Sequence, residues 1–516
     1  MTKQSFLKGT LILIVAGMIT RFLGFINRIV VARVMGQEGV GLYMMALPTF
    51  VLVINLTQFG LPVAISKRVA EAEAMGDKKK IKAILVISLS ITTLLSVIFT
   101  TAMILLAPLV AKHLLTDERV LYPLLAISPI VPIVAISSVL RGYFQGRQNM
   151  LPQAISQVIE QIVRITLVAF FVKALLPYGV EYAAAGAMIS AIIGEFVSLM
   201  YMIWMFKQKK RVKIFNRFLS SIKSGKQTFY ELMRIAIPTT GSRLVGSVSY
   251  FLEPILVVQS LAIAGIAAVE ATKQYGTLTG YAMPLLFLPT FITNSLSIAL
   301  VPAISEANAK NQTRLIHYRL QQSIRLSLAS GGIATVILFI FASPLLTYMY
   351  NDDSATSFLY IMAPFFLLLY FQTPLQSGLQ ALDYAKPAMW NSVIGSIVKF
   401  VALVVLASRP ELGIMGVALA IVIGVVVVTL LHYASLKKAI QFSMPFKEWA
   451  KIGALLGLTY AAAQFMKSML DTVGGNVFLF LGALLLLGII YLLLLQILGI
   501  VKKDEWKQIP IINRFL

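Results

Sequence analysis

Hydrophobic residues are arranged in runs of about twenty along the whole chain, and short polar intervals separate one run from the next. A run of this length is sufficient for a helix that crosses the hydrocarbon core of a bilayer. The pattern therefore predicts an all-α polytopic membrane protein with fourteen transmembrane helices. The predicted spans lie near residues 10–34, 42–66, 83–111, 121–141, 151–175, 183–206, 230–260, 276–302, 320–345, 358–380, 388–408, 412–436, 448–470 and 477–499.

The second half of the chain repeats the pattern of the first. Matched residues that lie 235 positions apart are Pro129 and Pro364, Pro152 and Pro387, and Arg164 and Lys399. Each repeat holds six spans, and an even number gives both copies the same orientation in the membrane. The sequence thus predicts two six-helix lobes related by a pseudo-two-fold axis along the membrane normal, an arrangement found in transporters.

This repeat divides the chain into four predicted parts. The N-lobe covers residues 1–206, a basic cytoplasmic linker covers 207–227, and the C-lobe covers 228–436. Residues 437–516 contain the last two helices, which lie outside the repeat, and a cytoplasmic tail.

Basic residues collect in alternate loops. The chain has 44 Lys and Arg residues against 21 Asp and Glu, a formal net charge of +23. The loops on one side include "DKKKIK" (77–82), Arg141, Arg147 and "KQKKRVKIFNRF" (207–218). The positive-inside rule places this side and both termini in the cytoplasm. The expected partners of these residues are therefore membrane lipids with anionic headgroups, and we predict no nucleic-acid binding.

The composition also limits the possible cofactors. Cysteine is absent, which excludes disulfides and thiolate metal sites. His113, His317 and His432 have no metal-binding spacing, and we interpret them as histidines at the membrane interface. No G-x-x-x-x-G-K-[ST] motif is present to bind a nucleotide. We expect no cofactor and no metal; transport would use the membrane potential, a substrate gradient or a coupling cation such as Na⁺ or H⁺.

Several charged residues lie inside predicted spans. Arg21 is near the middle of the first span, and Arg28 follows two helical turns later on the same face, with Gly24 between them. Asn27 adjoins this pair, and Arg243 occupies the position in the second repeat that matches Arg21. An arginine cannot lose its proton and is expensive in hydrocarbon, so these residues require an explanation.

The span at 151–175 has a polar stripe at helical spacing, formed by Gln153, Gln157, Glu160, Gln161 and Arg164. Glu160 and Arg164 are four residues apart, in the order that favours an ion pair. The matching span contains Lys399 with Asn391, Ser392 and Ser396, and the second span adds Asn55.

Two interpretations of these charges are open. They either pair with one another and hold the helices together, or line a hydrated cavity that accepts an anionic substrate. Five cations face only three carboxylates, and this surplus favours the cavity, where arginine would bind phosphate oxygens. The predicted cavity residues are Arg21, Asn27, Arg28, Asn55, Arg164, Arg243 and Lys399. The residues predicted to be structural or to couple transport to a cation are Glu160, Glu195, Glu253 and Asp383.

The segments "TRFLGFINRIVVARVMGQEGVGLYMMALP" (20–48) and "QFGLPVAISKRVAEAEAMGDKKK" (58–80) carry a family resemblance. Here the chain resembles the polysaccharide transporters of the multidrug/oligosaccharidyl-lipid/polysaccharide exporter superfamily, and within them a sporulation branch related to lipid II flippases. The resemblance matches Arg21 to the cavity arginine of those flippases. Asn27 stands where many of them have a second arginine on the first span.

The resemblance implies a flippase in the cytoplasmic membrane of a Gram-positive bacterium. Its substrate would be an undecaprenyl-pyrophosphate-linked sugar, such as lipid II for the spore cortex, and peptidoglycan synthases are candidate partners. By alternating access the two lobes would admit the pyrophosphate from the cytoplasm, and Arg21, Arg28 and Arg243 would neutralise it. The last two spans would form a track for the lipid tail or pad the outside of the bundle.

A drug/cation antiporter and a polytopic glycosyltransferase are the two alternative functions. A drug/cation antiporter of the same superfamily would place carboxylates and aromatic residues in its cavity rather than surplus arginines. A polytopic glycosyltransferase could use the carboxylates of "YNDD" (350–353), but this loop is short and faces outward, and we interpret it as an exposed polar loop. We therefore predict a transporter without catalytic residues.

Overall fold

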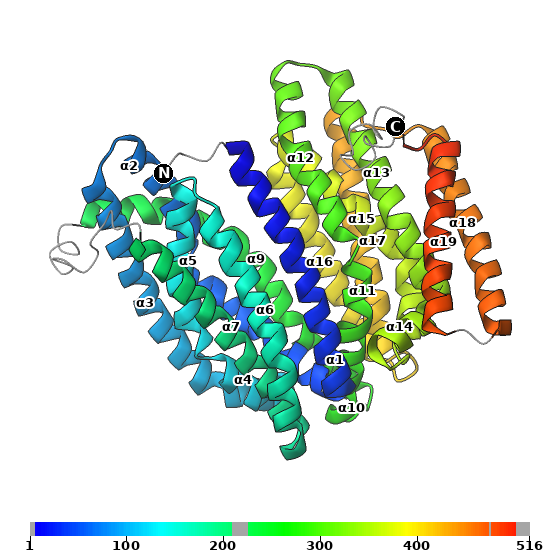
Figure 1. The fold of residues 1–516 in the computed structure, drawn as a ribbon, viewed down its shortest axis with the longest axis horizontal. Coiled ribbons are helices and arrows are strands. Elements are labelled where there is room, and N and C mark those ends of the chain that lie inside the picture. Colours follow the sequence, from blue (N-terminus) through cyan, green and yellow to red (C-terminus); the bar gives the residue numbers. More distant parts are fainter. Residues whose placement is uncertain (1–5, 209–224, 474–475, 502–516) are drawn as a thin grey trace. The chain divides into compact units, whose positions relative to one another are not determined.

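The computed structural model describes residues 6–208, 225–473 and 476–501, which are almost entirely helical (Figure 1). The chain forms two compact units, Met1–Gly280 and Tyr281–Leu516, hereafter the first and second unit. Most of the predicted linker at 207–227 lies outside the described residues. The division into an N-lobe, a linker and a C-lobe stays a prediction.

The first unit contains the helices up to residue 276 and the beginning of a π-helical segment at 277. Its elements are α1 (Phe6–Gln58), α2 (Leu61–Ala74), α3 (Lys78–Leu109), η1 (Val110–Leu114), η2 (Glu118–Val120), α4 (Leu121–Ile127), α5 (Ile130–Gly146), α6 (Leu151–Leu175), η3 (Leu176–Tyr178), α7 (Val180–Gln208), α9 (Lys226–Ile263), α10 (Ala268–Gly276) and η4 (Thr277–Ala282).

The second unit contains the remaining helices. They are α11 (Met283–Phe287), α12 (Thr290–Ala309), α13 (Thr313–Ile340), α14 (Ala342–Tyr350), α15 (Thr356–Ala381), α16 (Ala385–Ala407), α17 (Ile414–Ile440), α18 (Phe446–Val473) and α19 (Val477–Ile497). In Figure 1, α18 and α19 (orange and red) lie side by side, and they pack on each other.

The prediction of an all-helical polytopic membrane protein is confirmed, but the count of fourteen spans is not. Within the described ranges, nine helices are long and apolar enough to cross a membrane, or up to eleven if each of two bent helix pairs is one span. The helix α6, which carries the polar stripe, is not among the nine.

The first two predicted spans, 10–34 and 42–66, lie on either side of a kink in the element α1. The helix α1 continues from Phe6 to Gln58 and is kinked at Gly36, whose φ is 68°. Glycine adopts this left-handed conformation without steric cost, so the chain bends there without a loop. The helix α1 ends at Gln58, before the turn formed by Phe59 and Gly60, both also at positive φ, and α2 begins directly after it. The predicted span at 42–66 therefore crosses this turn.

Each unit has its own apolar core. In the first unit, buried residues of α2, α3, α5 and α9 pack together, among them Ile65, Ile84, Val139 and Leu232. In the second unit, the largest cluster joins α12, α13, α15 and α17, and smaller clusters attach α18 and α19 to α13. Large apolar side chains also point outward, as expected for helices surrounded by lipid.

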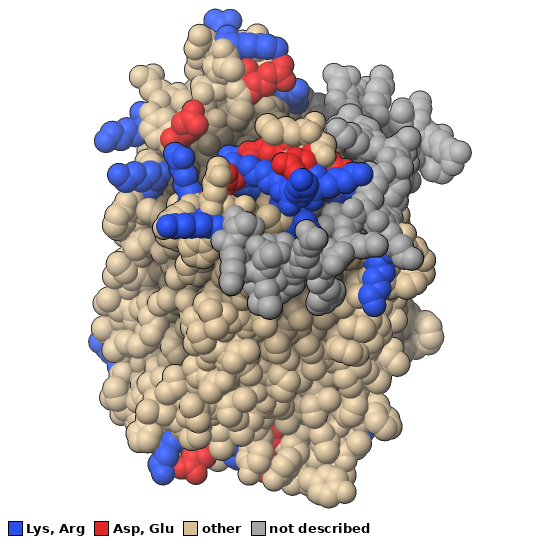
Figure 2. All heavy atoms as spheres, turned by 90° about the vertical axis from the view of Figure 1, so that its left-hand side faces the viewer, with Lys and Arg blue, Asp and Glu red and all other residues tan. Residues whose placement is uncertain are grey.

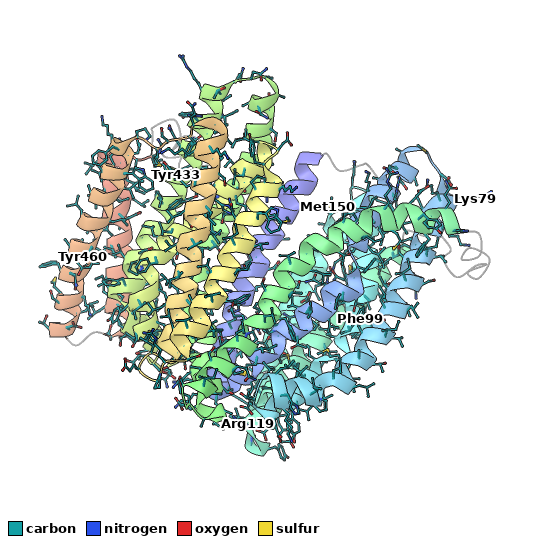
Figure 3. The ribbon with its side chains drawn as sticks, turned by 180° about the vertical axis from the view of Figure 1, so that it is seen from behind. Lys79, Phe99, Arg119, Met150, Tyr433 and Tyr460 are labelled. Carbon is teal, nitrogen blue, oxygen red and sulfur yellow. The ribbon has the colours of Figure 1, made fainter. Side chains whose placement is uncertain are left out.

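Charged residues of the first unit gather at the two ends of its helices. On the face drawn in Figure 2, Lys, Arg, Asp and Glu lie at two ends and other residues fill the band between them. Figure 3 labels Lys79 and Arg119 at opposite ends of this unit, with Phe99 between. An apolar band between charged ends is the pattern expected of a membrane-spanning bundle.

Candidate functional site

The interior of the first unit contains four charged side chains in contact, which we call the ion-paired cluster: Arg141 of α5, Glu160 and Arg164 of α6, and Glu195 of α7. Arg141 Nη2 donates to both carboxylate oxygens of Glu195, at 2.8 and 3.1 Å. Arg164 Nη2 donates to Glu160 Oε1 at 2.7 Å, and Arg141 Nη2 lies 3.8 Å from Glu160 Oε2. The cluster joins three helices and its charges sum to zero.

A glycine permits the close helix contact behind this cluster. The helices α6 and α7 pack along each other, and a Cβ atom added at Gly194 would lie 2.9 Å from the backbone oxygen of Glu160. The absence of a side chain at this position lets α7 approach α6. Glu195, the next residue, therefore enters the same interior region as Glu160.

A second group of cations differs from the cluster in its exposure and its partners. Arg21 and Arg28 of α1 and Arg243 of α9 are exposed, and we call them the arginine face. Among the described residues, no carboxylate forms a salt bridge with any of the three. Three permanent positive charges without an acidic partner attract an anion, and their guanidinium groups can donate two hydrogen bonds to one phosphate.

The arginine face borders the polar stripe of α6. A Cβ atom at Gly24, which lies between Arg21 and Arg28 along one helix face, would be 3.9 Å from Gln161 Oε1. Asn27, one turn after Gly24, is 7% exposed. Asn27 Oδ1 and Gln161 Oε1 are both buried without a hydrogen-bond donor in the described part of the chain. The adjoining sides of α1 and α6 thus hold two acceptor oxygens without a donor in the described part of the chain, one from each helix.

Asn55 is used to join two helices. Its Nδ2 donates to Ser247 Oγ at 2.6 Å, which links the second part of α1 to α9 one turn after Arg243. This contact joins the region of α9 next to Arg243 to the part of α1 after the kink at Gly36, whereas Arg21 and Arg28 lie in the part before it.

The other predicted site residues lie apart from these groups. Glu253 of α9 is half-buried and has interacting partners. Asp383 is exposed in the turn between α15 and α16, at a φ of 65°, where its carboxylate is open to solvent. Lys399 of α16 is half-buried, with Nζ 4.8 Å from the ring centre of Phe400, and it also has other partners.

Two residues differ from their sequence-based interpretation. Arg141, assigned to a cytoplasmic loop, is the partner of Glu195. The sequence offered one signal for this pairing: Glu195 is an interior carboxylate with no basic residue within one turn of its own helix. His432, interpreted as interfacial, is completely buried, with Nδ1 3.1 Å from Asn391 Nδ2. That interpretation was wrong because α17 continues to Ile440, which places His432 two turns inside the helix.

A further charged group lies at the opposite end of α3 from Lys79. Asp117 is 5% exposed and accepts hydrogen bonds from the backbone and guanidinium of Arg119 and, at 2.7 Å, from Thr272 Oγ1. Arg119 also pairs with Glu38. Burial alone would raise the pKa of Asp117, but the hydrogen bonds from Arg119 and Thr272 outweigh it and lower the pKa below its ordinary value.

Within the described ranges, no group of three or more His, Asp and Glu side chains is placed to hold a metal ion. The guanidinium groups of Arg21, Arg28 and Arg243 supply fixed positive charge, which can bind and neutralise an anionic group.

Comparison with known proteins places these features in a family. A model of the polysaccharide biosynthesis protein family matches residues 6–308, and one of the MatE family matches 254–405. Stage V sporulation protein B of Bacillus subtilis (strain 168) is 58% identical over 516 residues, which is 100% of both chains. Lipid II flippase MurJ of the same strain is 26% identical over 456 residues, covering 85% of this chain and 83% of that protein.

A solved structure, lipid II flippase MurJ in its inward closed conformation, has the same fold. The TM-score is 0.70 at 15% identity, and the match covers 94% of this chain and 97% of that chain. The predicted resemblance and the prediction of a transporter rather than an enzyme are both confirmed by these relatives.

Proposed function

This chain belongs to the polysaccharide biosynthesis protein family, and we propose that it moves an undecaprenyl-pyrophosphate-linked sugar across the cytoplasmic membrane. The sugar in this proposal is a peptidoglycan precursor such as lipid II, supplied for the spore cortex. The names of two relatives, a stage V sporulation protein and a lipid II flippase, support this choice of substrate and process.

The single observation that carries the proposal is the arginine face. Arg21, Arg28 and Arg243 are exposed and have no salt-bridge partner among the residues described. A charged headgroup crosses bare hydrocarbon only at high cost, because it loses its water there. Guanidinium groups that bind the pyrophosphate replace that water and lower the barrier.

A groove in the second unit supports a lipid-linked substrate. A cavity of about 850 Å³ lies between α12, α13 and α19 and is lined mainly by apolar side chains, including Leu326, Ile333, Leu485 and Leu492. We assign the polyprenyl tail to this groove. If α18 and α19 only packed against the outside of the bundle, nothing would occupy the groove.

The finer points of the proposal follow the sequence analysis. The protein lies in the cytoplasmic membrane of a Gram-positive bacterium with both termini in the cytoplasm, works by alternating access, and delivers its product to peptidoglycan synthases. It needs no cofactor, and a cation gradient or the membrane potential drives it.

The test is lipid flipping in reconstituted vesicles. Purified protein is inserted into vesicles that contain fluorescently labelled lipid II, and an impermeant quencher reports how fast the label changes leaflets. Because each guanidinium–phosphate contact contributes about 1.5–3 kcal/mol, Arg21→Ala and Arg243→Ala should each slow flipping about tenfold or more.

A matched control lies on the same helix as Arg243. Arg234 is also exposed, but it is nine residues away, two and a half turns, and therefore on the opposite face of α9. Arg234→Ala should flip lipid II at the wild-type rate. Undiminished flipping by Arg21→Ala would remove the arginine face from the mechanism, and transport of a lipophilic cation in place of lipid II would indicate a drug antiporter.

A further inference from the structure

The ion-paired cluster is balanced, but its members are not equivalent. Glu195, 5% exposed, is held by two hydrogen bonds from Arg141. Glu160, 12% exposed, is shared between Arg164 at 2.7 Å and Arg141 at 3.8 Å. Buried charges are tolerated when they are paired, and here two arginines are paired with two carboxylates.

Addition of one proton to Glu160 changes the cluster selectively. The pair of Arg141 and Glu195 would persist, because its two hydrogen bonds do not involve Glu160. Arg164 would lose its ionised partner, since Glu160 is the carboxylate with which it forms a salt bridge in the described structure. The cluster would then carry one net positive charge, located on Arg164.

Arg164 lies beside the arginine face. It follows Gln161 by one turn of α6, and Gln161 is the residue that meets α1 at Gly24, between Arg21 and Arg28. Arg164 Nε is buried and has no acceptor among the described residues, so one of its donors is already unused. The charged groups that face Glu160 are therefore Arg164 on its own helix, Arg141 from α5 and Glu195 from α7, with the arginines of α1 beyond Gln161.

We propose that protonation of Glu160 releases Arg164 to bind the pyrophosphate of the substrate, which couples binding to proton uptake. One proton from water joins a carboxylate oxygen of Glu160, and its ion pair with Arg164 ends. The positive charge that the cluster gains is offset by one negative charge of the pyrophosphate. Loss of the proton to water restores the ion pair and releases the substrate. This inference rests on the proposed function and gives the proton a role in substrate binding.

The experiment measures binding and proton uptake together. Full-length protein in lipid nanodiscs is titrated with undecaprenyl pyrophosphate by calorimetry, in buffers of different ionisation enthalpy, between about pH 6 and about pH 8. The wild type should take up as much as one proton per bound molecule. Its Kd should rise with pH by up to about tenfold per unit, the limit for one linked proton.

Three variants separate the roles. Glu160→Gln copies the protonated carboxyl, so it should bind without proton uptake and with a Kd independent of pH. Arg164→Gln should also lose the pH dependence while Arg21 and Arg28 still bind, which keeps the test valid if Glu160→Gln does not fold. Glu73→Gln removes a carboxylate that pairs with Arg147 at 3.1 Å outside the cluster, and should keep the wild-type profile.

The two proposals fail in different ways. If the wild type binds undecaprenyl pyrophosphate without proton uptake, or if Glu160→Gln retains the wild-type pH dependence, the coupling role of Glu160 is wrong and the flippase proposal stands. If the wild type does not bind undecaprenyl pyrophosphate at any pH in the range, the proposed function is wrong and the inference falls with it.

Discussion

The two units hold different polar groups at matching positions of the repeat. With the spacing of 235 residues, Glu160 and Glu195 of the first unit correspond to Gly395 and Leu430 of the second. The first unit thus has an ion-paired cluster between α6 and α7. Between α16 and α17 the second unit keeps a cation, Lys399, at the position of Arg164 but has no matching carboxylates. It has in addition an uncharged group, in which Asn391 Nδ2 lies 3.1 Å from His432 Nδ1 and 2.9 Å from Ser435 Oγ.

Helix packing accounts for this difference. In the second unit the residue that matches Glu160 is itself a glycine on the earlier helix, and a Cβ atom at Gly395 would lie 2.0 Å from Val428 Cγ2. The later helix α17 also has a close-contact glycine, Gly424, which packs against Lys399. In the first unit the glycine is on the later helix, at Gly194, which leaves the earlier helix free to carry Glu160. The same helix pair can therefore be closed by an apolar side chain or by charges. The charged version contains two carboxylates that can take up a proton, whereas the second-unit group contains one imidazole, that of His432.

The largest expected effect comes from copying one residue of the second unit into the first. The substitution Glu195→Leu introduces the residue that the second unit has at the matching position, Leu430. It leaves Glu160 as the one remaining carboxylate of the cluster for both Arg141 and Arg164. Breaking a buried ion pair from one side costs about 3–5 kcal/mol. Unfolding by denaturing detergent, followed by tryptophan fluorescence, should show a loss of that size.

The double variant is the control. Arg141→Gln together with Glu195→Leu copies both residues of the second unit, since Gln376 corresponds to Arg141. Replacement of a whole buried pair is often neutral, so most of the lost stability should return. A single Glu195→Leu variant as stable as the wild type would mean that Arg141 does not depend on Glu195.

The comparison also indicates what sequence patterns can predict. The span at 151–175 was predicted with the bounds that α6 has, Leu151–Leu175, because a proline near its start and a long amphipathic run define it. The first two spans were also predicted as separate, and the non-helical residue Gly36, with φ 68° and ψ −178°, lies between them. The form of this break could not be predicted, because no spacing of hydrophobic residues reveals whether a glycine adopts a positive φ.

Contacts of the site between residues close in sequence can be predicted, and contacts between distant residues cannot. The ion pair between Glu160 and Arg164 follows from their spacing of four residues. The partner of Glu195 is Arg141, 54 residues away, and this pairing is set by packing of three helices. The exposed state of Arg21 and Arg28 agrees with the surplus of cations over carboxylates, which is a property of the sequence alone. Their predicted role in substrate binding stays untested.

An intermediate loss of stability is expected from a substitution at Asp117, in the loop between two helices of the first unit. Asp117 and Arg119 of the first unit correspond to Asp352 and Ser354 of the second, so only Asp117 has a matching arginine. Asp117→Asn places an amide donor against the guanidinium of Arg119 and weakens the bond from Thr272. The expected loss at neutral pH is about 2 kcal/mol, typical of leaving buried hydrogen-bonding groups unsatisfied.

The pH dependence of unfolding gives this prediction a specific signature. The folded state lowers the pKa of Asp117, so its stabilisation is present above the ordinary value of 3.8 and is lost as the pH falls through the folded value. The wild type should lose stability in acid below about pH 4, and Asp117→Asn should lack that component. Asp353→Asn, at an exposed residue of the matching loop, is the control and should leave the acid profile unchanged. Equal acid profiles for the wild type and Asp117→Asn would contradict the proposed hydrogen-bonded state of this carboxylate.

The smallest effect is expected from the uncharged group of the second unit. Asn391→Leu removes the amide that contacts His432 and Ser435, but it leaves no buried charge behind. Hydrogen bonds between membrane helices contribute about 0.6 kcal/mol on average and up to about 1.7, so a loss of about 1 kcal/mol is expected in the same detergent titration. The double variant Asn391→Leu with His432→Leu should be no less stable than the single one, because it also removes the imidazole that had lost its partner. A loss as large as that of Glu195→Leu would show that the second unit depends on its polar contacts as strongly as the first, and would remove the distinction in stability between the ion-paired cluster and the Asn391 group.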